Sequence, residues 1–438
     1  MFGAYTQRPM DAQTQRAAVL DDLEWRRMIA HHTDLDALRD AMRAGPVSFY
    51  GGFDPTAQSL HFGNLVLLVT MRRLQLAGHR PIGLVGGATG LVGDPSGRTS
   101  ERVLNDPGVV AGWVDRIREQ VERYLSFEGD NAAVIANNLD WTAAMSAIDW
   151  LRDVGKHFSV SRMLAKESVS ARMEAGGITY TEFSYQMMQA VDFLELYRRH
   201  DCTLQLGGSD QWGNLTAGAD LIRRVEGVTA HALATPLITR PDGEKFGKST
   251  GSTLWLDPAL TSPFAFYQWF LNTDDGVVGT YLRVFSFRPR AEIEELEASV
   301  RARPDSREAQ RALAGEVTEL VHGPDAAIAA SAASQALFGQ GELSTLDAGT
   351  LEAAFADLPR ANVAASDGMP SVLELFVASG LSESRGQARR TLNEGGAYMN
   401  NQRVTDTAAV PDRADLLAGR WLLLRRGKRN LAVVEVRA

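Results

Sequence analysis

Cysteine is almost absent from this chain, which has one, Cys202, in 438 residues. A single cysteine forms neither an internal disulfide nor a cysteine zinc cluster, so we expect a small buried apolar residue and a reducing compartment. With 45% hydrophobic residues, a chain of this length should fold without such support, as two or three domains.

Long apolar runs are also missing. No run approaches the roughly 20 residues that span a bilayer, and the opening stretch MFGAYTQRPMDAQTQR lacks the pattern of a signal peptide. The sequence therefore predicts a soluble cytoplasmic protein. Residues 1–20 are expected to form a flexible extension.

An overall excess of positive charge is missing too, because the formal net charge is −9. Proteins that coat nucleic acid indiscriminately usually carry a basic field, so that class is disfavoured. The segment from Ser371 to Ala438 differs, with 11 Lys and Arg against 7 Asp and Glu. This distribution predicts a nucleic-acid contact confined to a basic C-terminal end.

Short apolar runs alternate with longer amphipathic ones over residues 1–255, a pattern typical of strands feeding helices in a parallel sheet. Strands are predicted at PVSFY, RPIGLV and CTLQL, and each opens into a polar, glycine-rich loop. Doubly wound sheets bind ligands where such loops follow the carboxyl ends of strands. The predicted fold class is α/β, with a Rossmann-like doubly wound parallel sheet and one shared site.

The rest of the chain divides by composition. Residues 256–338 show helical periodicity without a clear strand, which predicts an α-helical domain. Residues 339–369 are rich in Gly, Ala, Asp and Pro, so we interpret them as a linker with one short helix. A third domain is predicted over residues 370–438.

The stretch FYGGFDPTAQSLHFGNL, residues 49–65, places a glycine turn before a predicted helix. Amides at a helix N-terminus can seat a phosphate, and His61 and Asn64 would add side-chain donors. Gly51 and Gly52 would let a flat ligand approach the backbone. The alternative is a helix-capped turn with a satisfied histidine.

A second stretch, DGEKFGKST at residues 242–250, contains a Gly-Lys-Ser triplet. A P-loop needs four residues between its glycines, whereas Gly243 and Gly247 have three between them, so the P-loop interpretation fails. Lys245 and Lys248 could instead reach two phosphates. The alternative is a solvated basic turn.

The segment FSYQMMQAVDFLELYRR predicts a helix on which Tyr185, Gln189 and Asp192 project from one face. A core-facing stripe should be apolar, and this one is polar. An ordinary solvent face is the alternative, although such a face more typically carries Lys and Glu.

Together these stretches resemble a known family. HFGN resembles the HIGH motif and KFGKS the KMSKS motif of class I aminoacyl-tRNA synthetases. GFDPTAQSLHFGN, GGATGLVGDPSG, FSYQMMQAVDF and GGSDQWGN are similar to the bacterial tyrosyl-tRNA synthetases, over nearly the whole chain. The resemblance implies a tyrosine–tRNA ligase that forms tyrosyl-adenylate from L-tyrosine and ATP, then charges the 3′-terminal adenosine of tRNA(Tyr).

The resemblance implies a tyrosine pocket. Tyr50 and Asp192 would bind the phenolic hydroxyl, and Asp94, Tyr185 and Gln189 the α-ammonium group. Phenylalanine would leave the buried polar groups unpaired. Two further residues implied by the resemblance are Gln211, near the tyrosine carboxylate, and Asn138, behind the pocket.

The resemblance also implies how ATP is held. No nucleophile beside a base is visible, and none is needed, because the tyrosine carboxylate can attack the α-phosphate. The catalytic set, which would hold triphosphate and departing pyrophosphate, is Thr56, His61, Asn64, Arg98, Arg102, Lys245 and Lys248. The other ATP contacts would be Gly52, Asp54, Gly208 and Asp210. Mg²⁺ would arrive with ATP, without a dedicated metal site.

Two positions depart from the family pattern. Asn64 stands where the family has histidine, and it can donate a hydrogen bond but cannot be charged. Arg98 stands where lysine is common, and guanidinium binds phosphate at least as well. Activity is expected to survive both changes.

Outside the catalytic part, the resemblance implies further partners. The tail from Ser371 resembles the S4-type RNA-binding domain, a small α+β unit, and the helical domain would meet the anticodon region. RNA contacts are expected at Arg385, Arg389, Arg390, Arg425, Arg426 and Lys428, with a solvated basic surface as the alternative. Residues 140–200 resemble the family's dimer interface, which predicts a homodimer.

Two other functions are weighed on the sequence alone. A tryptophanyl-tRNA synthetase would share the fold but lack the pairing of Tyr50 with Asp192 and the S4-like tail. The other is a chain that has lost catalysis and only binds RNA. The intact HFGN and KFGKS stretches, with both aspartates of the pocket, argue against that loss.

Overall fold

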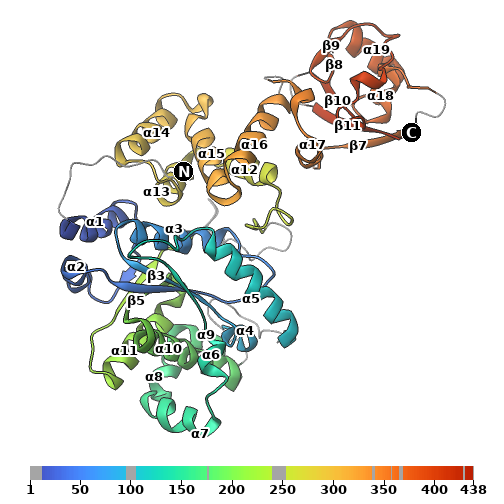
Figure 1. Cartoon of the computed structure of the whole chain (residues 1–438). Coiled ribbons are helices and arrows are strands. Elements are labelled where there is room, and N and C mark those ends of the chain that lie inside the picture. The colour runs from blue at the N-terminus through green and yellow to red at the C-terminus, as the bar shows by residue number, and fades with distance from the viewer. Residues whose placement is uncertain are drawn as a thin grey trace. The chain divides into compact units, whose positions relative to one another are not determined.

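The chain forms two compact units (Figure 1). The computed structural model describes residues 12–94, 105–174, 177–238, 253–337, 341–356, 358–364, 368–427 and 430–437. The first unit comprises residues 1–257 and 279–287, and the second comprises residues 258–278 and 288–438. Among the described residues, no helix is long and apolar enough to cross a bilayer.

The first unit is built on a six-stranded sheet in the order β1-β6-β5-β2-β3-β4. Neighbouring strands are parallel except for β1, which runs antiparallel to β6. The three predicted strands are confirmed as β2 (Ser48–Phe53), β3 (Arg80–Val85) and β5 (Cys202–Gly208), and they are adjacent. The others are β1 (His31–His32), β4 (Val134–Asn137) and β6 (His231–Thr235).

The winding of the chain creates a switch point in this sheet. From β2 the chain adds β3 and β4 on one side, and it then adds β5 and β6 on the other side of β2. In such doubly wound sheets, ligands bind at the carboxyl ends of the strands beside the reversal. The predicted Rossmann-like fold class is thereby confirmed, and the site is expected at the ends of β2 and β5.

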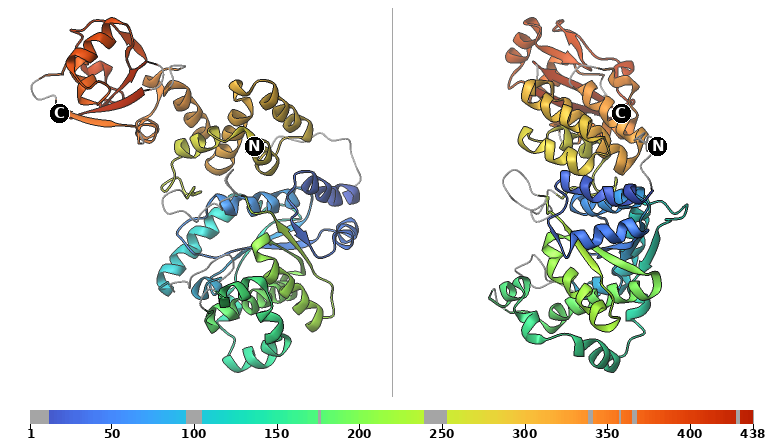
Figure 2. Two further views of the ribbon diagram at one scale, coloured as in Figure 1. Left: turned by 180° about the vertical axis from the view of Figure 1, so that it is seen from behind. Right: turned by 90° about the vertical axis from the view of Figure 1, so that its left-hand side faces the viewer.

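Helices cover both faces of the sheet (Figure 2). On one face lie α3 (Phe62–Leu76) and α5 (Pro107–Glu122), and on the other α10 (Tyr180–His200) and α11 (Trp212–Val225). The remaining helices of this unit are α1 (Ala12–Trp25), α2 (Leu35–Ala44), α4 (Thr89–Val92), α6 (Leu139–Thr142), α7 (Ala147–Asp149), α8 (Val160–Leu164), α9 (Glu167–Glu174), a π-turn at Trp150–Val154 and 3-10 turns at Gly155–His157 and Ser209–Gln211.

Two expectations about the first unit need correction. The extension expected over residues 1–20 is helical from Ala12 onward, because Leu20 and Leu23 of α1 are buried. Gly51 does not face a ligand, since a Cβ there would lie 2.6 Å from the Met71 sulfur on α3. Alternate residues of a strand face opposite sides. Among the described residues, the one atom within 4 Å of a Cβ placed on Gly52 is a ring carbon of Tyr50, at 3.9 Å.

Helices fill the predicted helical region. Helix α13 (Asp275–Phe285) crosses the boundary between the units. The second unit contains α12 (Pro263–Leu271), α14 (Arg290–Ala302), α15 (Glu308–His322) and α16 (Pro324–Leu337), with a 3-10 turn at Pro304–Ser306. Within residues 253–337, as described, no strand is formed, as predicted.

The C-terminal part is a small α+β fold on a five-stranded sheet in the order β7-β11-β10-β8-β9. Its strands are β7 (Arg360–Ala364), β8 (Ala397–Met399), β9 (Gln402–Val404), β10 (Trp421–Arg426) and β11 (Asn430–Arg437). Its helices are α17 (Ala348–Phe355), α18 (Val372–Ala378) and α19 (Arg385–Asn393), with 3-10 turns at Leu343–Thr345 and Arg413–Asp415.

The segment interpreted as a linker belongs to this fold. Strand β7 pairs parallel with β11, and the ring of Phe355 on α17 lies 6.0 Å from that of Trp421. Leu351 and Phe355 are fully buried in the same core. The short helix expected in residues 339–369 is present as α17. The linker interpretation was wrong over the rest of the described part, because β7 pairs with β11 and α17 packs into the same core.

Candidate active site

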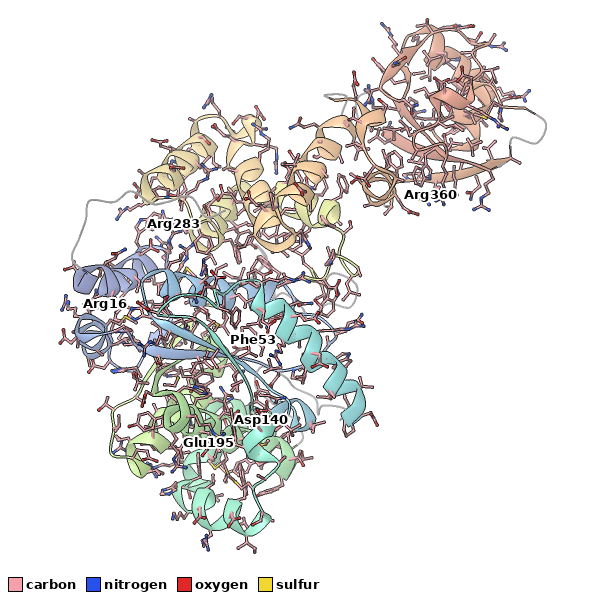
Figure 3. All side chains as sticks on the ribbon, in the orientation of Figure 1. Arg16, Phe53, Asp140, Glu195, Arg283 and Arg360 are labelled. Atoms are coloured by element: carbon pink, nitrogen blue, oxygen red, sulfur yellow. The ribbon has the colours of Figure 1, made fainter. Side chains whose placement is uncertain are left out.

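Several predicted residues converge where the central strands end. Tyr50 lies on β2, and Asp54 directly follows Phe53, which is labelled in Figure 3. Asn138 follows β4, Asp94 follows α4, and Gln211 follows β5. Together with the polar face of α10, these loops surround one site, as the loop positions predict.

Asp192 is held by two side-chain donors. Asn138 Nδ2 donates to Asp192 Oδ2 at 3.0 Å, and Trp141 Nε1 donates to Asp192 Oδ1 at 2.9 Å. Asn138 is itself oriented, because its Oδ1 accepts from Ala88 N at 2.7 Å. Burial raises the pKa of Asp192 to about 7, although both hydrogen bonds favour the carboxylate. Since each carboxylate oxygen has two lone pairs, Asp192 can still accept from a ligand.

Tyr50 lies beside this carboxylate. Its ring is buried and packs 5.3 Å from the ring of Phe193. Burial raises the pKa of Tyr50 well above its usual value, and the charge of Asp192 raises it further. In the described part of the chain, the Tyr50 hydroxyl has no hydrogen-bond partner. The site thus offers a ligand the neutral Tyr50 hydroxyl and the Asp192 carboxylate side by side.

A second network joins Asp54 to this centre. Tyr185 Oη donates to Asp54 Oδ2 and Thr89 Oγ1 donates to Asp54 Oδ1, both at 2.6 Å. Asn138 Nδ2 also lies 2.9 Å from Thr89 Oγ1, so the two networks share an amide. Burial raises the pKa of Tyr185 well above its ordinary value, with Asp54 and then Asp94 adding to the effect. Asp54 therefore contacts a residue predicted to bind tyrosine.

Asp94 is hydrogen-bonded to Gln211, in the loop after β5. Gln211 Nε2 donates to Asp94 Oδ2 at 2.5 Å, and Asn214 Nδ2 donates to Gln211 Oε1 at 2.9 Å. The next turn is anchored where Gly213 O accepts from Lys166 Nζ at 2.5 Å and from Gln186 Nε2 at 3.0 Å. Burial lowers the pKa of Lys166. The position of Gln211 is thus fixed from two sides.

The predicted polar face of α10 points inward. Tyr185 and Asp192 are buried, so an ordinary solvent face is ruled out for them. Gln189 lies between them and is half-buried, and its Oε1 has no partner among the described residues. Glu195, labelled in Figure 3, lies one turn further along the helix.

His61 and Asn64 form a capping box at the start of α3. His61 Nδ1 accepts from Gly63 N, and Asn64 Oδ1 accepts from His61 N, both at 3.0 Å. Burial lowers the pKa of His61, so the ring is neutral and carries its proton on Nε2. The helix cap is therefore formed, and the cap itself does not use His61 Nε2–H or Asn64 Nδ2.

The other predicted ATP contacts that the structure describes lie on or just after β2 and β5. Gly52 and Thr56 are exposed near the end of β2. Gly208 ends β5, and a Cβ there would lie 2.7 Å from Asp210 Oδ1. Five predicted residues lie outside the described residues, namely Arg98, Arg102, Lys245, Lys248 and Lys428. Within the described ranges, no group of three or more His, Cys, Asp or Glu could hold a metal ion.

Sequence reasoning missed three members of the site. Trp141 donates a hydrogen bond to Asp192, and Thr89 donates one to Asp54. Lys166 donates to Gly213 O and so anchors the loop that carries Gln211. Trp141 lies three residues after Asn138 in the stretch ANNLDW, which was a usable signal because one short loop can carry both donors. Thr89 and Lys166 offered no local signal. Cys202 is buried in β5, as expected.

The predicted RNA-contact residues occupy a different part of the molecule. Arg385, Arg389 and Arg390 are exposed on α19, and Arg385 pairs with Glu374 at 2.7 Å. The Arg425 guanidinium lies 3.9 Å from the centre of the Tyr398 ring, and Arg426 is half-buried. Three arginines thus project from one short helix.

The similarity of this chain to known proteins agrees with that geometry. Residues 42–339 match the family described as tRNA synthetases class I (W and Y), and residues 350–434 match the tyrosine–tRNA ligase SYY-like C-terminal domain. The chain therefore belongs to the class I tRNA synthetases of the tryptophan and tyrosine group.

Its relatives narrow that assignment. The tyrosine–tRNA ligase of Streptomyces coelicolor is 60% identical over 420 residues, which cover 95% of this chain and 99% of that protein. The tyrosine–tRNA ligase of Acidothermus cellulolyticus is 58% identical over 421 residues, 95% of this chain and 99% of that protein. Within the class, the chain is a member of the tyrosine–tRNA ligase family.

Solved structures share the fold. A C-terminally truncated mitochondrial tyrosyl-tRNA synthetase of Aspergillus nidulans superposes with a TM-score of 0.68 at 30% identity, covering 75% of this chain and 98% of that chain. A tryptophanyl-tRNA synthetase of Encephalitozoon cuniculi has a TM-score of 0.53 at 14% identity, covering 72% of this chain and 91% of that chain. The second likeness concerns the fold alone.

Proposed function

We propose that this chain activates L-tyrosine with ATP, releasing pyrophosphate, and transfers tyrosine from the adenylate to tRNA(Tyr). The observation that carries the proposal is the buried Asp192 carboxylate, fixed by Asn138 and Trp141 beside the Tyr50 hydroxyl. Such an arrangement suits a substrate phenol that donates its proton to the Asp192 carboxylate and accepts a hydrogen bond from the Tyr50 hydroxyl. Membership of the tyrosine–tRNA ligase family supports the same substrate.

Rejection of phenylalanine follows from the same groups. A ligand without the hydroxyl would leave the Tyr50 hydroxyl and the spare lone pairs of Asp192 buried and unpaired, and each such group costs about 1–3 kcal/mol. Tyrosyl-tRNA synthetases as a class are known to discriminate by about 10⁵-fold without editing, which sets the scale expected here.

The α-ammonium group would lie between the two acidic loops. Asp94, Tyr185 and Gln189 are the proposed contacts, and Gln211 would face the tyrosine carboxylate. Because Asp54 accepts from the Tyr185 hydroxyl, we infer that Asp54 also orients Tyr185, in addition to its expected place near ATP. The nearby negative charges would favour a cation at this point.

ATP would lie across the start of α3. The amides at the helix N-terminus, His61 Nε2–H and Asn64 Nδ2 are the proposed donors to the triphosphate, with Thr56 beside them. Gly52, Gly208 and Asp210 would contact the nucleoside. Arg98, Arg102, Lys245 and Lys248 are proposed to stabilise pyrophosphate as it departs. Mg²⁺ would be bound mainly by the phosphates it accompanies.

The tRNA and a second copy of the chain are the remaining proposed partners. The exposed arginines of α19, with Arg425, Arg426 and Lys428, would contact folded RNA through its phosphates. Homodimerisation is supported by exposed apolar side chains in the segment expected to form the interface, namely Ile148, Leu151, Val160, Leu164 and Tyr180. Light scattering should give about twice the 47.7 kDa of one chain. Because charged tRNA is consumed by translation, we propose that this enzyme acts in the cytoplasm.

The direct test is amino-acid-dependent exchange of pyrophosphate into ATP, run in parallel with tyrosine, phenylalanine and tryptophan. Exchange with tyrosine alone is expected. Exchange with tryptophan in preference to tyrosine would refute the pocket assignment. No exchange from folded protein, together with retained tRNA binding, would favour the chain that only binds RNA.

A further inference from the structure

Two buried polar side chains outside the pocket, Ser59 and Gln120, are hydrogen-bonded to each other and to nearby backbone groups. They are 4% and 6% exposed. Gln120 Nε2 donates to Ser59 Oγ at 3.2 Å, and Gln120 Oε1 accepts from Leu60 N at 2.9 Å. Ser59 Oγ in turn donates to Leu60 O at 2.7 Å and accepts from Asp257 N at 3.2 Å. Both side chains are thus engaged with backbone groups.

These bonds join three segments that are distant in sequence. Gln120 lies in the last turn of α5, and Leu60 directly precedes His61, the N-cap of α3. The segment 254–257 runs beside that cap, because Phe62 N donates to Leu254 O at 2.8 Å and Leu256 N donates to Leu60 O at 2.9 Å. This segment follows the KFGKST stretch in the sequence.

We propose that Gln120 is a positioning residue for the phosphate end of the active site. Through Leu60 and Ser59, it holds the start of α3, with His61 and Asn64, against residues 254–257. The inference rests on the proposed function, because it takes His61 and Asn64 as ATP contacts. Gln120 need not touch substrate, since a displacement of about 1 Å in a reacting group can cost about 100-fold in rate.

A second buried glutamine provides a matched control. Gln75 is 3% exposed and lies in the last turn of α3, at the other end of the helix from His61. Its Oε1 accepts from Ser126 N at 2.9 Å and its Nε2 donates to Ser126 O at 2.7 Å. Gln75 Oε1 also accepts from Arg72 Nη1 at 2.7 Å, and Gln75 Nε2 lies 3.2 Å from Asn131 O. Gln75 therefore makes at least as many hydrogen bonds as Gln120, without holding the capping turn.

The experiment compares Gln120→Met with Gln75→Met, because methionine nearly preserves the volume of glutamine and removes its hydrogen bonds. Thermal unfolding should show a loss of stability in both variants, with the loss in Gln75→Met at least as large as that in Gln120→Met. In pyrophosphate exchange, Gln120→Met should lose about 10- to 100-fold in kcat/KM for ATP, with the KM for tyrosine unchanged within about twofold. Gln75→Met should keep both parameters near those of the wild type.

Each outcome decides a separate point. Equal kinetics of the two variants would overturn the positioning role, and so would a parallel loss on the tyrosine side, which indicates general damage. If Gln120→Met does not fold, Ser59→Ala removes one hydroxyl of the same network and should shift the ATP parameters in the same direction. A wild-type protein that exchanges with no amino acid would instead refute the proposed function.

Discussion

The proposed tyrosine pocket and the arginine-bearing surface of the C-terminal fold use polar groups in opposite ways. In the pocket, Asp192 is buried and each of its oxygens accepts a hydrogen bond before any ligand arrives. On α19, Arg389 and Arg390 are exposed to solvent. A buried, preorganised group discriminates strongly between ligands, whereas exposed charges contribute small, screened increments. Substitutions should therefore have large, specific effects in the pocket and modest, salt-dependent effects on the surface.

The largest effect is expected from Asp192→Ala. The change removes the proposed acceptor of the substrate phenol, takes the acceptor from Trp141 Nε1 and leaves Asn138 Nδ2 with Thr89 Oγ1 alone. The kcat/KM for tyrosine should therefore fall about 10³-fold or more. Pyrophosphate exchange measures this loss, and tRNA binding should stay near that of the wild type. The control is Glu195→Ala on the same helix, which should change exchange by no more than about twofold. Normal exchange in Asp192→Ala would refute the site.

The surface should respond to charge and salt. Arg389→Ala combined with Arg390→Ala should raise the KM for tRNA about 10-fold and lower the slope of log affinity against log salt by roughly 2, because two phosphate contacts are lost. Pyrophosphate exchange should not change. Arg413→Ala with Arg437→Ala removes the same charge from other exposed positions of this fold. An equal effect of that control pair would indicate non-specific attraction.

The pH dependence of the free energy of unfolding should also reveal the raised pKa of the Asp192 carboxyl group. The pKa of Asp192 is about 7 in the folded chain and near 3.8 for an ordinary aspartate, so between pH 6 and 8 the folded state holds a proton that the unfolded state has lost. Raising the pH over this range should therefore lower the free energy of unfolding by about 1.4 kcal/mol. Burial lowers the pKa values of His61 and His79. These two histidines therefore make the free energy of unfolding rise with pH, opposite to Asp192.

The contribution of Asp192 is isolated by a difference measurement. Denaturant unfolding of the substrate-free protein at pH 6 and pH 8 is compared with that of Asp192→Asn, which retains both histidines. The wild type should lose more stability than the variant as the pH rises. Identical pH dependences in the two proteins would contradict the raised pKa.

The smallest effect is expected from Tyr50→Phe. One neutral hydrogen bond to the substrate hydroxyl contributes about 0.5–1.5 kcal/mol, so the preference for tyrosine over phenylalanine should fall roughly 3- to 10-fold. The ratio of kcat/KM values for the two amino acids measures it. An unchanged ratio would show that Asp192 alone recognises the phenol.

The sequence signals that succeeded are local and strong. Apolar runs ending in glycine-rich loops predict β2, β3 and β5, and the polar positions of α10 predict an inward face, because strand and helix periods are set by neighbouring residues. The helix cap and the donors of His61 and Asn64 are likewise properties of one turn. Local patterns thus predict that these side chains meet at the ends of the strands.

The features that were missed depend on distant partners. Strand β7 exists because β11 pairs with it, and Gly51 is small because α3 packs there. Thr89 and Lys166 look unremarkable in sequence, and only the folded chain brings them to Asp54 and Gly213. Tertiary contacts of this kind leave no periodicity to detect.

The position of β11 has a consequence for biosynthesis. Although it follows the other strands in the sequence, it lies between β7 and β10 in the sheet. On the ribosome, β7 and β10 emerge earlier and expose unpaired edges until residues 430–437 have left the exit tunnel. Unpaired edges invite aggregation and proteolysis. A chain that terminates prematurely before Asn430 would keep those edges, and quality-control proteases would recognise it.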